Sequence, residues 1–574
     1  MVWLFVDEAL STKGLHQGPL DALIPDCNEY DVMLYQHGGK VSAVADGFCN
    51  ADQNEAATKF SALFCLAAQE RPQLLVSPEY SCPWSVIEEQ IQNNQWPPAG
   101  KAWVVGCESI RPDELEDLRN RHDSVTWLVS SFSPERDQVF LDAACIFITA
   151  TDGEGNELKV LAVQAKGCAM ADRRHRIEPD SLILGSERFI LRNDPDSIHL
   201  VVFICSDALE QKIFTSLPHS EHFPYIVLHI QLNPDPRHLG FREYRDFWGD
   251  HDRHNIEIIC LNWARGTEVL GDSIPFGGSA WYYKSSDVTA SDDEVNDSHR
   301  LGAYYAENRK RYFHCHVLNY AEHVFHLRCC KVSQTRSLPP TRRKRTGPRA
   351  VAVHSWEPAS SAWQAGTADD GFSDCCARIG GDLAPLTDTA LSPVDKERLV
   401  CLSNCAVNVS NATPWPHVRS LPSFEMTANE VCQRVTFCHD PDEESCERRK
   451  RWLHGFGVLK NEIMSGTAEF PAHLRQLQAD GRLQYPVSPK CLSFNVADSH
   501  GEFPAVFVYL GEVSERYATE KISDLGDILG EARRSLVVWF RQNGQLRYVC
   551  PGGLADLDAN LRESPKSIVR ESST

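Results

Sequence analysis

Short apolar runs alternate with amphipathic segments over the first part of the chain. In 54–69, apolar side chains recur every three to four residues, at Ala56, Phe60 and Leu63, and this spacing predicts an amphipathic helix. Helices are also expected at 85–93 and 241–255, and strands at 31–36, 73–77, 102–106, 141–150, 160–164, 199–205, 225–232 and 256–261. Such alternation is typical of β-sheets covered by helices, so we expect an α/β fold.

Two of these strands are neighbours in the chain and are separated by the turn-forming sequence Asp152–Asn156. Gly, Asn and Asp tolerate the backbone conformations of tight turns, so a short segment rich in them reverses the chain. The strands 141–150 and 160–164 are therefore predicted to pair as an antiparallel hairpin.

The character of the sequence changes after residue 333. The stretch 336–349 is basic, contains prolines and shows no apolar period. We therefore expect 334–350 to be a linker or exposed loop between a first domain, 1–333, and a C-terminal domain, 351–574. A solvated linker is the simpler interpretation, although 336–349 could also contact a protein or nucleic-acid partner through its positive charge.

The C-terminal domain shows weaker but recognisable patterns. An alternating-charge helix is expected near 446–459, and a strand at 505–509. A terminal hairpin is expected from 535–542 and 547–549. Together these elements predict a smaller α+β region whose role the patterns do not define.

The length and net charge of the chain limit the classes of protein to which it can belong. A chain of 574 residues is long for one domain. The net charge of −22 argues against a nucleic-acid-binding surface over the whole chain. No apolar stretch reaches the ~20 residues that span a bilayer, and residues 1–10 lack the basic flank of a signal peptide. We therefore expect a cytoplasmic protein that makes no membrane contact.

The cysteine content is also consistent with a cytoplasmic protein. The 21 cysteines are scattered, and several of them, including Cys65, Cys145 and Cys260, lie inside apolar runs. We expect buried free thiols in a reducing compartment in preference to a disulfide framework.

Three side chains that could take part in catalysis lie where predicted strands end. An apolar run precedes each of Glu79, Lys166 and Cys205. A thiol attacks an amide carbon only as a thiolate, or with a base that takes its proton. Glu79 could be that base, and Lys166, together with the backbone N–H that follows Cys205, could stabilise the resulting oxyanion.

Each of these residues alone has a simpler explanation. A cysteine in an apolar strand is more often part of the core, a glutamate after a proline is ordinary in loops, and a lysine that ends a strand commonly faces solvent. The ordered set of three, each at the end of an apolar strand, is more specific than any member. The set therefore predicts a thiol hydrolase.

In this order and context, Glu79, Lys166 and Cys205 resemble the Glu-Lys-Cys triad of the nitrilase superfamily of carbon–nitrogen hydrolases. Further segments that look like the family's active-site loops and its late hairpin follow at 232–236, 262–266 and 274–280. The resemblance covers roughly 1–333 and does not reach the C-terminal region.

Membership of that superfamily would imply a fold, an assembly and a chemistry. The fold would be an αββα sandwich with the active site at the three strand ends. The assembly would be a homodimer or larger homo-oligomer. The substrate would be a small-molecule amide, and the reaction would need neither a metal nor an organic cofactor.

Four more residues are candidates for substrate binding: Ser206, Asn233, Glu178 and Arg237. Ser206 stands where the family often has a bulky residue, and Asn233 lies in a loop that in the family borders the active site. Family members often carry a second glutamate after the lysine, and Glu178 lies farther along that loop than the resemblance leads one to expect. Arg237 could equally belong to a structural layer of ion pairs.

Cysteine and histidine residues also crowd the stretch from Cys432 to His454. Zinc sites use such ligands in fours, commonly as closely spaced pairs. Here the gaps are irregular and no Cys-x-x-Cys pair occurs, so we predict no metal at this stretch.

The leading hypothesis is a nitrilase-like amide hydrolase that works through a thioester on Cys205. Two alternatives belong to other classes. One is an effector or interaction subunit of a bacterial anti-phage defence system, a setting in which nitrilase-like domains occur with reverse transcriptases. The other is a catalytically silent scaffold that oligomerises.

Overall fold

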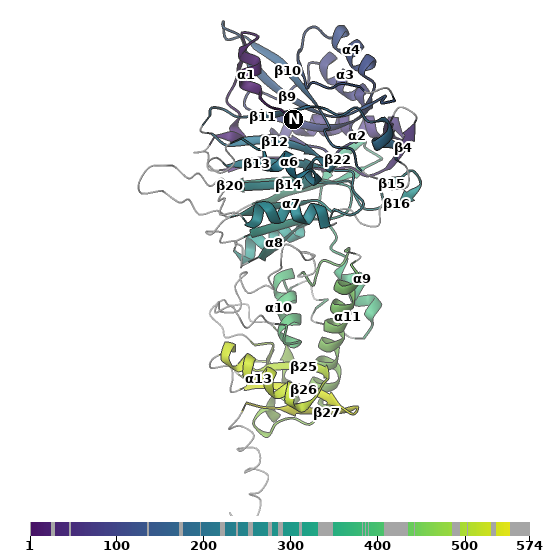
Figure 1. Ribbon diagram of the computed structural model, residues 1–574. Helices are drawn as coiled ribbons and strands as arrows, with labels where there is room; N and C mark the ends of the chain where they lie inside the picture. The colour runs from purple at the N-terminus through teal and green to yellow at the C-terminus, as the bar shows by residue number, and fades with distance from the viewer. Residues whose placement is uncertain are drawn as a thin grey trace, which may run out of the picture. The chain divides into compact units, whose positions relative to one another are not determined.

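The computed structural model of the chain contains two compact units (Figure 1). Unit 1 comprises Met1–Ala290, Asp297–Asp369 and Phe424–Glu430, and unit 2 comprises Ser291–Asn296, Asp370–Ser423 and Val431–Thr574. The structure describes residues 2–24, 29–44, 47–134, 137–170, 176–195, 197–218, 224–236, 239–250, 256–273, 278–284, 291–308, 313–330, 348–381, 383–384, 386–387, 390–406, 434–440, 442–484, 494–501, 503–529 and 535–551.

Two large mixed sheets form the centre of unit 1. Sheet A has the strand order β1 (Val2–Phe5), β11 (Glu187–Leu191), β12 (His199–Ile204), β13 (Tyr225–Ile230), β14 (Ile256–Leu261), β17 (Ala280–Lys284), β19 (Phe313–Leu318) and β18 (Ala303–Asn308). Sheet B has the order β22 (Ala362–Ala365), β21 (Arg349–Glu357), β20 (His323–Cys330), β3 (Glu29–Gln36), β6 (Leu74–Val76), β7 (Ala102–Ile110), β9 (Leu141–Thr151), β10 (Glu157–Ala165) and β8 (Thr126–Val129), and β2 (His16–Gln17) pairs with β9.

Smaller elements complete unit 1. A short sheet has the order β16 (Asp272–Ser273), β15 (Glu268–Val269), β4 (Lys40–Val44) and β5 (Gly47–Asn50). The helical elements are α1 (Val6–Ser11), η1 (Asp21–Leu23), α2 (Gln53–Glu70), α3 (Trp84–Gln92), α4 (Pro112–Arg121), α5 (Ile177–Ser181), η2 (Cys205–Leu209), α6 (Gln211–Thr215) and α7 (Leu239–Asp250), and α8 (Asp292–Arg300) crosses the division between the units. The longest of them, α2, begins where Asp52 accepts a hydrogen bond from Glu55 N and ends at Arg71 in a left-handed conformation.

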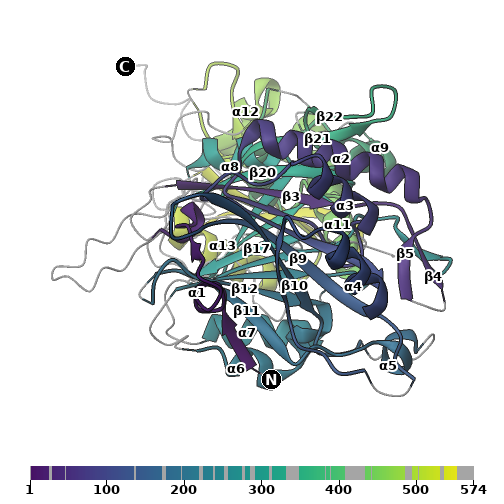
Figure 2. The same cartoon turned by 90° about the horizontal axis from the view of Figure 1, so that it is seen from above.

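The alternation of side chains along the strands builds a layered core. In β9, Ala144 and Ile146 belong to a core that both sheets share, while Cys145 and Phe147 face the opposite side, with residues of α2 and α3. The far face of sheet A is covered by α7, whose Tyr244 ring contacts the rings of Phe203 in β12 and His229 in β13. Figure 2 shows α2 and α3 on one side of the sheets and α7 on the other. This arrangement confirms the expected αββα sandwich.

The predicted hairpin is confirmed as the pair β9 and β10. Its register runs from Thr151 opposite Glu157 to Ala143 opposite Ala165. The turn between them is closed by the Asp152 side chain, which accepts hydrogen bonds from Glu154 N and Asn156 N. This register determines which residues of β9 and β10 lie opposite one another at the end of the hairpin away from the turn.

The expected boundary after residue 350 needs a correction. Strand β21 pairs with β20, and β22 pairs with β21, so both strands belong to sheet B of unit 1. The segment of unit 1 that begins at Asp297 therefore continues past 350 to Asp369. A strand pairs where a sheet edge offers free backbone groups, and composition alone does not reveal that edge. Most of the basic stretch 336–349 lies outside the described residues.

Unit 2 has its own hydrophobic core. Its helical elements are α9 (Phe372–Ile379), α10 (Pro393–Ser403), α11 (Glu443–Val458) with a π-helical continuation at Leu459–Thr467, η6 (Ala472–Leu474), α12 (Arg475–Asp480) and α13 (Glu515–Leu529). Its strands are β23 (Arg482–Leu483), which pairs with β24 (Val496–Ala497), and β25 (Val506–Glu512), β26 (Leu536–Gln542) and β27 (Gln545–Val549), which form one sheet. These elements confirm the smaller α+β region and its terminal hairpin. Among the described residues, no helix combines the length and apolar character that a bilayer crossing requires.

Candidate active site

Glu79 lies in the loop after β6, at the edge of sheet B. The backbone of β7 approaches this loop so closely at Gly106 that a Cβ atom there would come within 2.2 Å of the Pro78 carbonyl oxygen. Trp263 Nε1 donates a 2.6 Å hydrogen bond to the Glu79 carbonyl oxygen, and Leu232 N donates one of 2.6 Å to Glu79 Oε2. Contacts from three other segments therefore hold both the backbone and the carboxylate of Glu79.

Lys166 follows β10 directly and is tied to both sheets. Its backbone N–H donates to the Asp142 carbonyl oxygen at 2.8 Å, which extends the hairpin register by one pair. Two residues earlier, the buried Gln164 crosses to sheet A, where its amide donates to Val202 O and accepts from Phe189 N, both at 2.9 Å. This side chain couples the strand that carries Lys166 to the strand that precedes Cys205.

Cys205 is the first residue of η2, in a strained turn that directly follows β12. Its φ of 41° lies in the left-handed region, which costs a non-glycine residue roughly 1–2 kcal/mol. Asp207 holds the turn by accepting hydrogen bonds from Ile204 N at 3.2 Å and Gly167 N at 2.9 Å, and it forms a buried ion pair with Arg188. The turn is thus anchored to the residue that follows Lys166.

His229 supports the same turn from the other face of sheet A. Its Nε2 lies 2.9 Å from the Cys205 carbonyl oxygen, which can only accept, so this nitrogen carries the proton. Its Nδ1 lies near two donors, Gln231 Nε2 at 3.4 Å and Cys260 Sγ at 3.7 Å. Burial lowers the pKa of His229 to about 3, so the ring is neutral.

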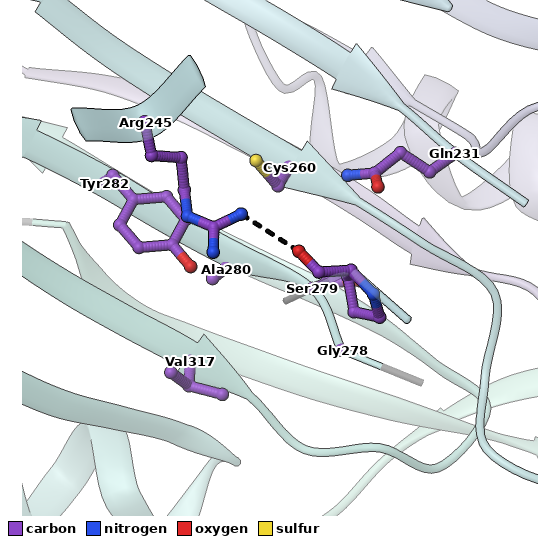
Figure 3. A pocket seen from close by; sticks show the side chains of 9 residues that line it. Gln231, Arg245, Cys260, Gly278, Ser279, Ala280, Tyr282 and Val317 are labelled. Atoms are coloured by element: carbon purple, nitrogen blue, oxygen red, sulfur yellow. Dashed lines mark hydrogen bonds between the residues drawn. The ribbon is translucent and has the colours of Figure 1, made fainter. Parts of the chain in front are cut away.

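A small cavity of about 10 Å³ adjoins this polar layer between α7 and sheet A (Figure 3). Gln231, Cys260, Tyr282 and Arg245 are among its lining residues. Arg245 Nη1 donates to the Pro236 carbonyl oxygen at 3.0 Å, the dashed contact in Figure 3. The volume corresponds to roughly one water molecule, so the cavity suits solvent and not an organic substrate.

The side chains of the three predicted residues meet in a buried charge cluster. Lys166 Nζ lies 2.6 Å from Glu79 Oε1, 2.7 Å from Glu178 Oε1 and 3.3 Å from Asp142 Oδ2. Glu79, Lys166 and Cys205 are each at most 1% exposed. One ammonium group is therefore surrounded by three carboxyl groups, and Cys205 lies close enough to interact electrostatically with Lys166 and Glu79.

Burial and charge shift the proton affinities of this cluster. Burial raises the pKa of the Cys205 thiol well above its usual value, the negative charge of Glu79 raises it further, and Lys166 offsets this only in part. Burial also raises the pKa of Glu79, against the pull of Lys166. For Lys166, burial disfavours the ammonium, but the surrounding carboxylates outweigh it and raise the pKa. Cys205 is thus a neutral thiol at rest, and its activation requires a base.

The four candidate substrate-binding residues are placed differently. Glu178 contacts Lys166 through both carboxylate oxygens, so it belongs to the charge cluster. The Ser206 hydroxyl donates to the Cys168 carbonyl oxygen. Asn233 is buried, and its amide donates to Gln231 and accepts from Asp235 N. Arg237 lies outside the described residues.

Asp142 and His229 also belong to the site, and the sequence patterns did not single them out. Asp142 could have been found, because the predicted hairpin turn places it opposite Lys166 once the pairing is counted back from Asp152–Asn156. His229 carried no such signal, since only the packing of β13 against β12 brings it beneath Cys205.

Glu79, Asp142 and Glu178 could by their spacing hold a cation. The Lys166 ammonium group already lies between these three carboxyl groups. It takes the position that a metal ion would need, so the three residues leave no place for one. No other metal-ligand cluster occurs in the described residues, and Cys432 lies outside them. The cysteines that the structure describes are free thiols, as expected, and Cys145 and Cys260 are buried, but the expectation was wrong for Cys65, which is exposed.

Fold and site together define an αββα sandwich with a thiol, a carboxylate and an ammonium group at adjoining strand ends. No protein-family model and no curated protein matches the chain. Solved structures that it resembles include an amidase from Nesterenkonia sp. AN1 in complex with butyramide, at 14% identity over 45% of this chain and 84% of that chain, with a TM-score of 0.25.

Two further structures show the same degree of likeness. One is XC1258 from Xanthomonas campestris, a CN-hydrolase superfamily protein, at 13% identity over 44% of this chain and 83% of that chain, with a TM-score of 0.27. The other is a glutamine-dependent NAD+ synthetase from Acinetobacter baumannii, at 10% identity over 65% of this chain and 53% of that chain, with a TM-score of 0.29. At these TM-scores, the chemistry of this chain has to be inferred from its own residues.

Proposed function

We propose that the protein is a carbon–nitrogen hydrolase that cleaves a small amide through a covalent thioester on Cys205. The observation that carries the proposal is the buried contact of Lys166 with Glu79, next to a cysteine held in a strained turn. Strained backbone persists only where the surrounding structure holds it, and here that structure consists of polar contacts to Asp207 and His229.

The first half of the reaction forms the thioester. Glu79 takes the proton from the Cys205 thiol as sulfur bonds to the amide carbon, and the carbonyl electron pair moves to oxygen. Lys166 and the Ser206 backbone N–H stabilise this oxyanion. When the intermediate collapses, the carbon–nitrogen bond breaks and Glu79 gives its proton to the leaving amine.

The second half regenerates the enzyme. Glu79 takes a proton from water as the water oxygen attacks the thioester carbon. Collapse of the second intermediate breaks the carbon–sulfur bond, releases the carboxylic acid and returns the proton to the Cys205 sulfur. Every proton that Glu79 accepts is passed on, so the base is unchanged after one cycle.

Thiol labelling followed by intact mass and peptide mapping tests this function. Native protein is treated with iodoacetamide, and the rate at Cys205 is compared with the rate at Cys65, an exposed thiol in the same chain. We expect Cys205 to react faster than Cys65 despite its burial, and Glu79→Gln to slow Cys205 alone. Cys205→Ala should lose both this label and the release of ammonia from a panel of primary amides.

Equal or slower labelling of Cys205 relative to Cys65, together with no ammonia release, would contradict the proposal. The two alternatives, an effector subunit of a defence system and a silent scaffold, would then become the leading hypotheses. Light scattering of the same sample measures the expected homo-oligomer.

A further inference from the structure

The charge cluster contains more negative than positive groups, and all of them are buried. Glu79, Asp142 and Glu178 each place a carboxyl oxygen within 4.8 Å of the others. Lys166 is the cation that contacts all three. Three ionised carboxylates around one ammonium group would leave two uncompensated negative charges away from water, which is costly in a medium of low polarity. Binding one proton would halve that excess.

The carboxyl groups of the cluster differ in the hydrogen bonds that they accept. Glu178 accepts from Lys166, from the Tyr80 hydroxyl at 2.9 Å and from Met170 N at 2.6 Å. Glu79 accepts from Lys166 and from Leu232 N. Donors of this number and kind stabilise a carboxylate.

Asp142 differs from both of these residues. It is fully buried, and neither of its side-chain oxygens accepts a hydrogen bond from any described residue. Its contact with Lys166 is the longest of the three, at 3.3 Å. A carboxyl group without donors but beside a carboxylate is suited to be a donor itself.

We propose that Asp142 holds a proton at neutral pH and donates it in a hydrogen bond to the Glu79 carboxylate, which makes Asp142 a positioning residue for the catalytic base. Burial and the charge of Glu79 both raise the pKa of Asp142, in agreement with this assignment. The other ionisable groups that face Asp142 are Lys166, Glu178, Tyr80 and Cys205.

The proton on Asp142 does not depend on the proposed function; only its effect on catalysis rests on that function. A hydrogen bond from Asp142 keeps Glu79 ionised, and therefore able to accept a proton, at a lower pH than burial alone would allow. The proton of Asp142 stays in place through the cycle, while Glu79 takes and returns the mobile proton.

The protonation state can be measured without any activity. Infrared spectra of the full chain should contain the carbonyl stretch of a buried carboxylic acid near neutral pH. Asp142→Asn should remove this band, and the control variant Glu397→Gln, which removes a buried carboxylate outside the cluster, should leave it. A band that survives Asp142→Asn would overturn the assignment.

The pH dependence of Cys205 labelling tests the positioning role. Asn can donate from its amide as protonated Asp does, so Asp142→Asn should keep the acid limb of the profile in place. Asp142→Leu removes the donor and should move that limb upward by about one pH unit, which is about tenfold in rate on the limb. If Asp142 were ionised, both variants would remove a negative charge and move the limb downward.

The two proposals fail in distinguishable ways. Loss of the infrared band in Asp142→Asn with no selective labelling of Cys205 would refute the hydrolase and keep the buried proton. Selective labelling with a downward shift in both variants would keep the hydrolase and refute the proton on Asp142.

Discussion

The two units each bury charged side chains, and they do so in opposite ways. In unit 2, Glu397 pairs with Arg434 at 2.9 Å and also accepts from the Thr436 backbone N–H and hydroxyl. That pair is balanced, with one positive and one negative charge. In unit 1, Lys166 faces three carboxyl groups, and the neighbouring Cys205 backbone is strained.

The difference separates a structural ion pair from a chemical site. A balanced pair with its hydrogen bonds satisfied recovers much of the cost of burial and orders the chain around it. An unbalanced cluster raises the proton affinity of its acids and of the adjoining thiol, which is unfavourable for stability but suits proton transfer. Under the proposed function, the chemistry belongs to unit 1, and the buried pair of unit 2 has a structural role.

Removing Lys166, the only cation of the cluster among the described residues, should have the largest effect. Lys166→Met leaves the carboxyl groups of Glu79, Asp142 and Glu178 facing one another without compensation. We expect a loss of ~3–5 kcal/mol in the stability of unit 1, together with loss of selective Cys205 labelling. Calorimetry and peptide mapping measure the two effects. Retained fast labelling would show that Lys166 is not part of the chemistry.

Breaking the balanced pair should affect stability alone. Glu397→Gln leaves the Arg434 charge buried without its carboxylate, and we expect the unfolding transition of unit 2 to lose about 3 kcal/mol. The labelling rate of Cys205 should not change. A change in that rate would contradict the division of roles between the two buried clusters.

Loss of the support beneath the nucleophile should have an intermediate effect. His229→Ala removes the hydrogen bond to the Cys205 carbonyl oxygen, worth about 1.4 kcal/mol, so labelling should slow about tenfold. Because burial lowers the pKa of His229 to about 3, the ring stays neutral over the range of the assay, and the slowing should be uniform with pH. Asn at this position keeps a donor and serves as the matched control.

Removing an exposed ion pair should have the smallest effect on stability. Arg516 and Glu520 lie one turn apart on α13 at 3.1 Å, and both side chains are largely exposed. Arg516→Ala should change the stability of unit 2 by less than about 0.5 kcal/mol. A larger loss would mean that surface charge contributes to this unit more than its geometry indicates.

The pH dependence of labelling follows from the raised pKa values of the site. Glu79 accepts a proton only when ionised, so the rate should rise with pH through a pKa above the ordinary value for glutamate. The thiol pKa is also raised, so the rate should continue to rise toward alkaline pH in Glu79→Gln. A profile that is flat across neutral pH would indicate a preformed thiolate instead.

Many helices and strands of unit 1 could be predicted, because each forms from a pattern of neighbouring residues in the chain. The helix expected at 54–69 is α2, and the hairpin expected around Asp152–Asn156 is β9 and β10. Each depends on periodicity or turn chemistry within a few residues. The expected boundary at 350 was misplaced, because β21 pairs with β20 across the basic stretch that was expected to separate two domains, and β22 pairs with β21.

The sequence by itself determined the strands that end at Glu79, Lys166 and Cys205, since a buried strand and the polar residue after it are adjacent in the chain. Only the tertiary structure decided which groups surround them. Glu178 reaches Lys166 from α5, and His229 reaches Cys205 because β13 lies beside β12. Proton affinities depend on such neighbours and on the exclusion of water, which arise when distant segments pack together.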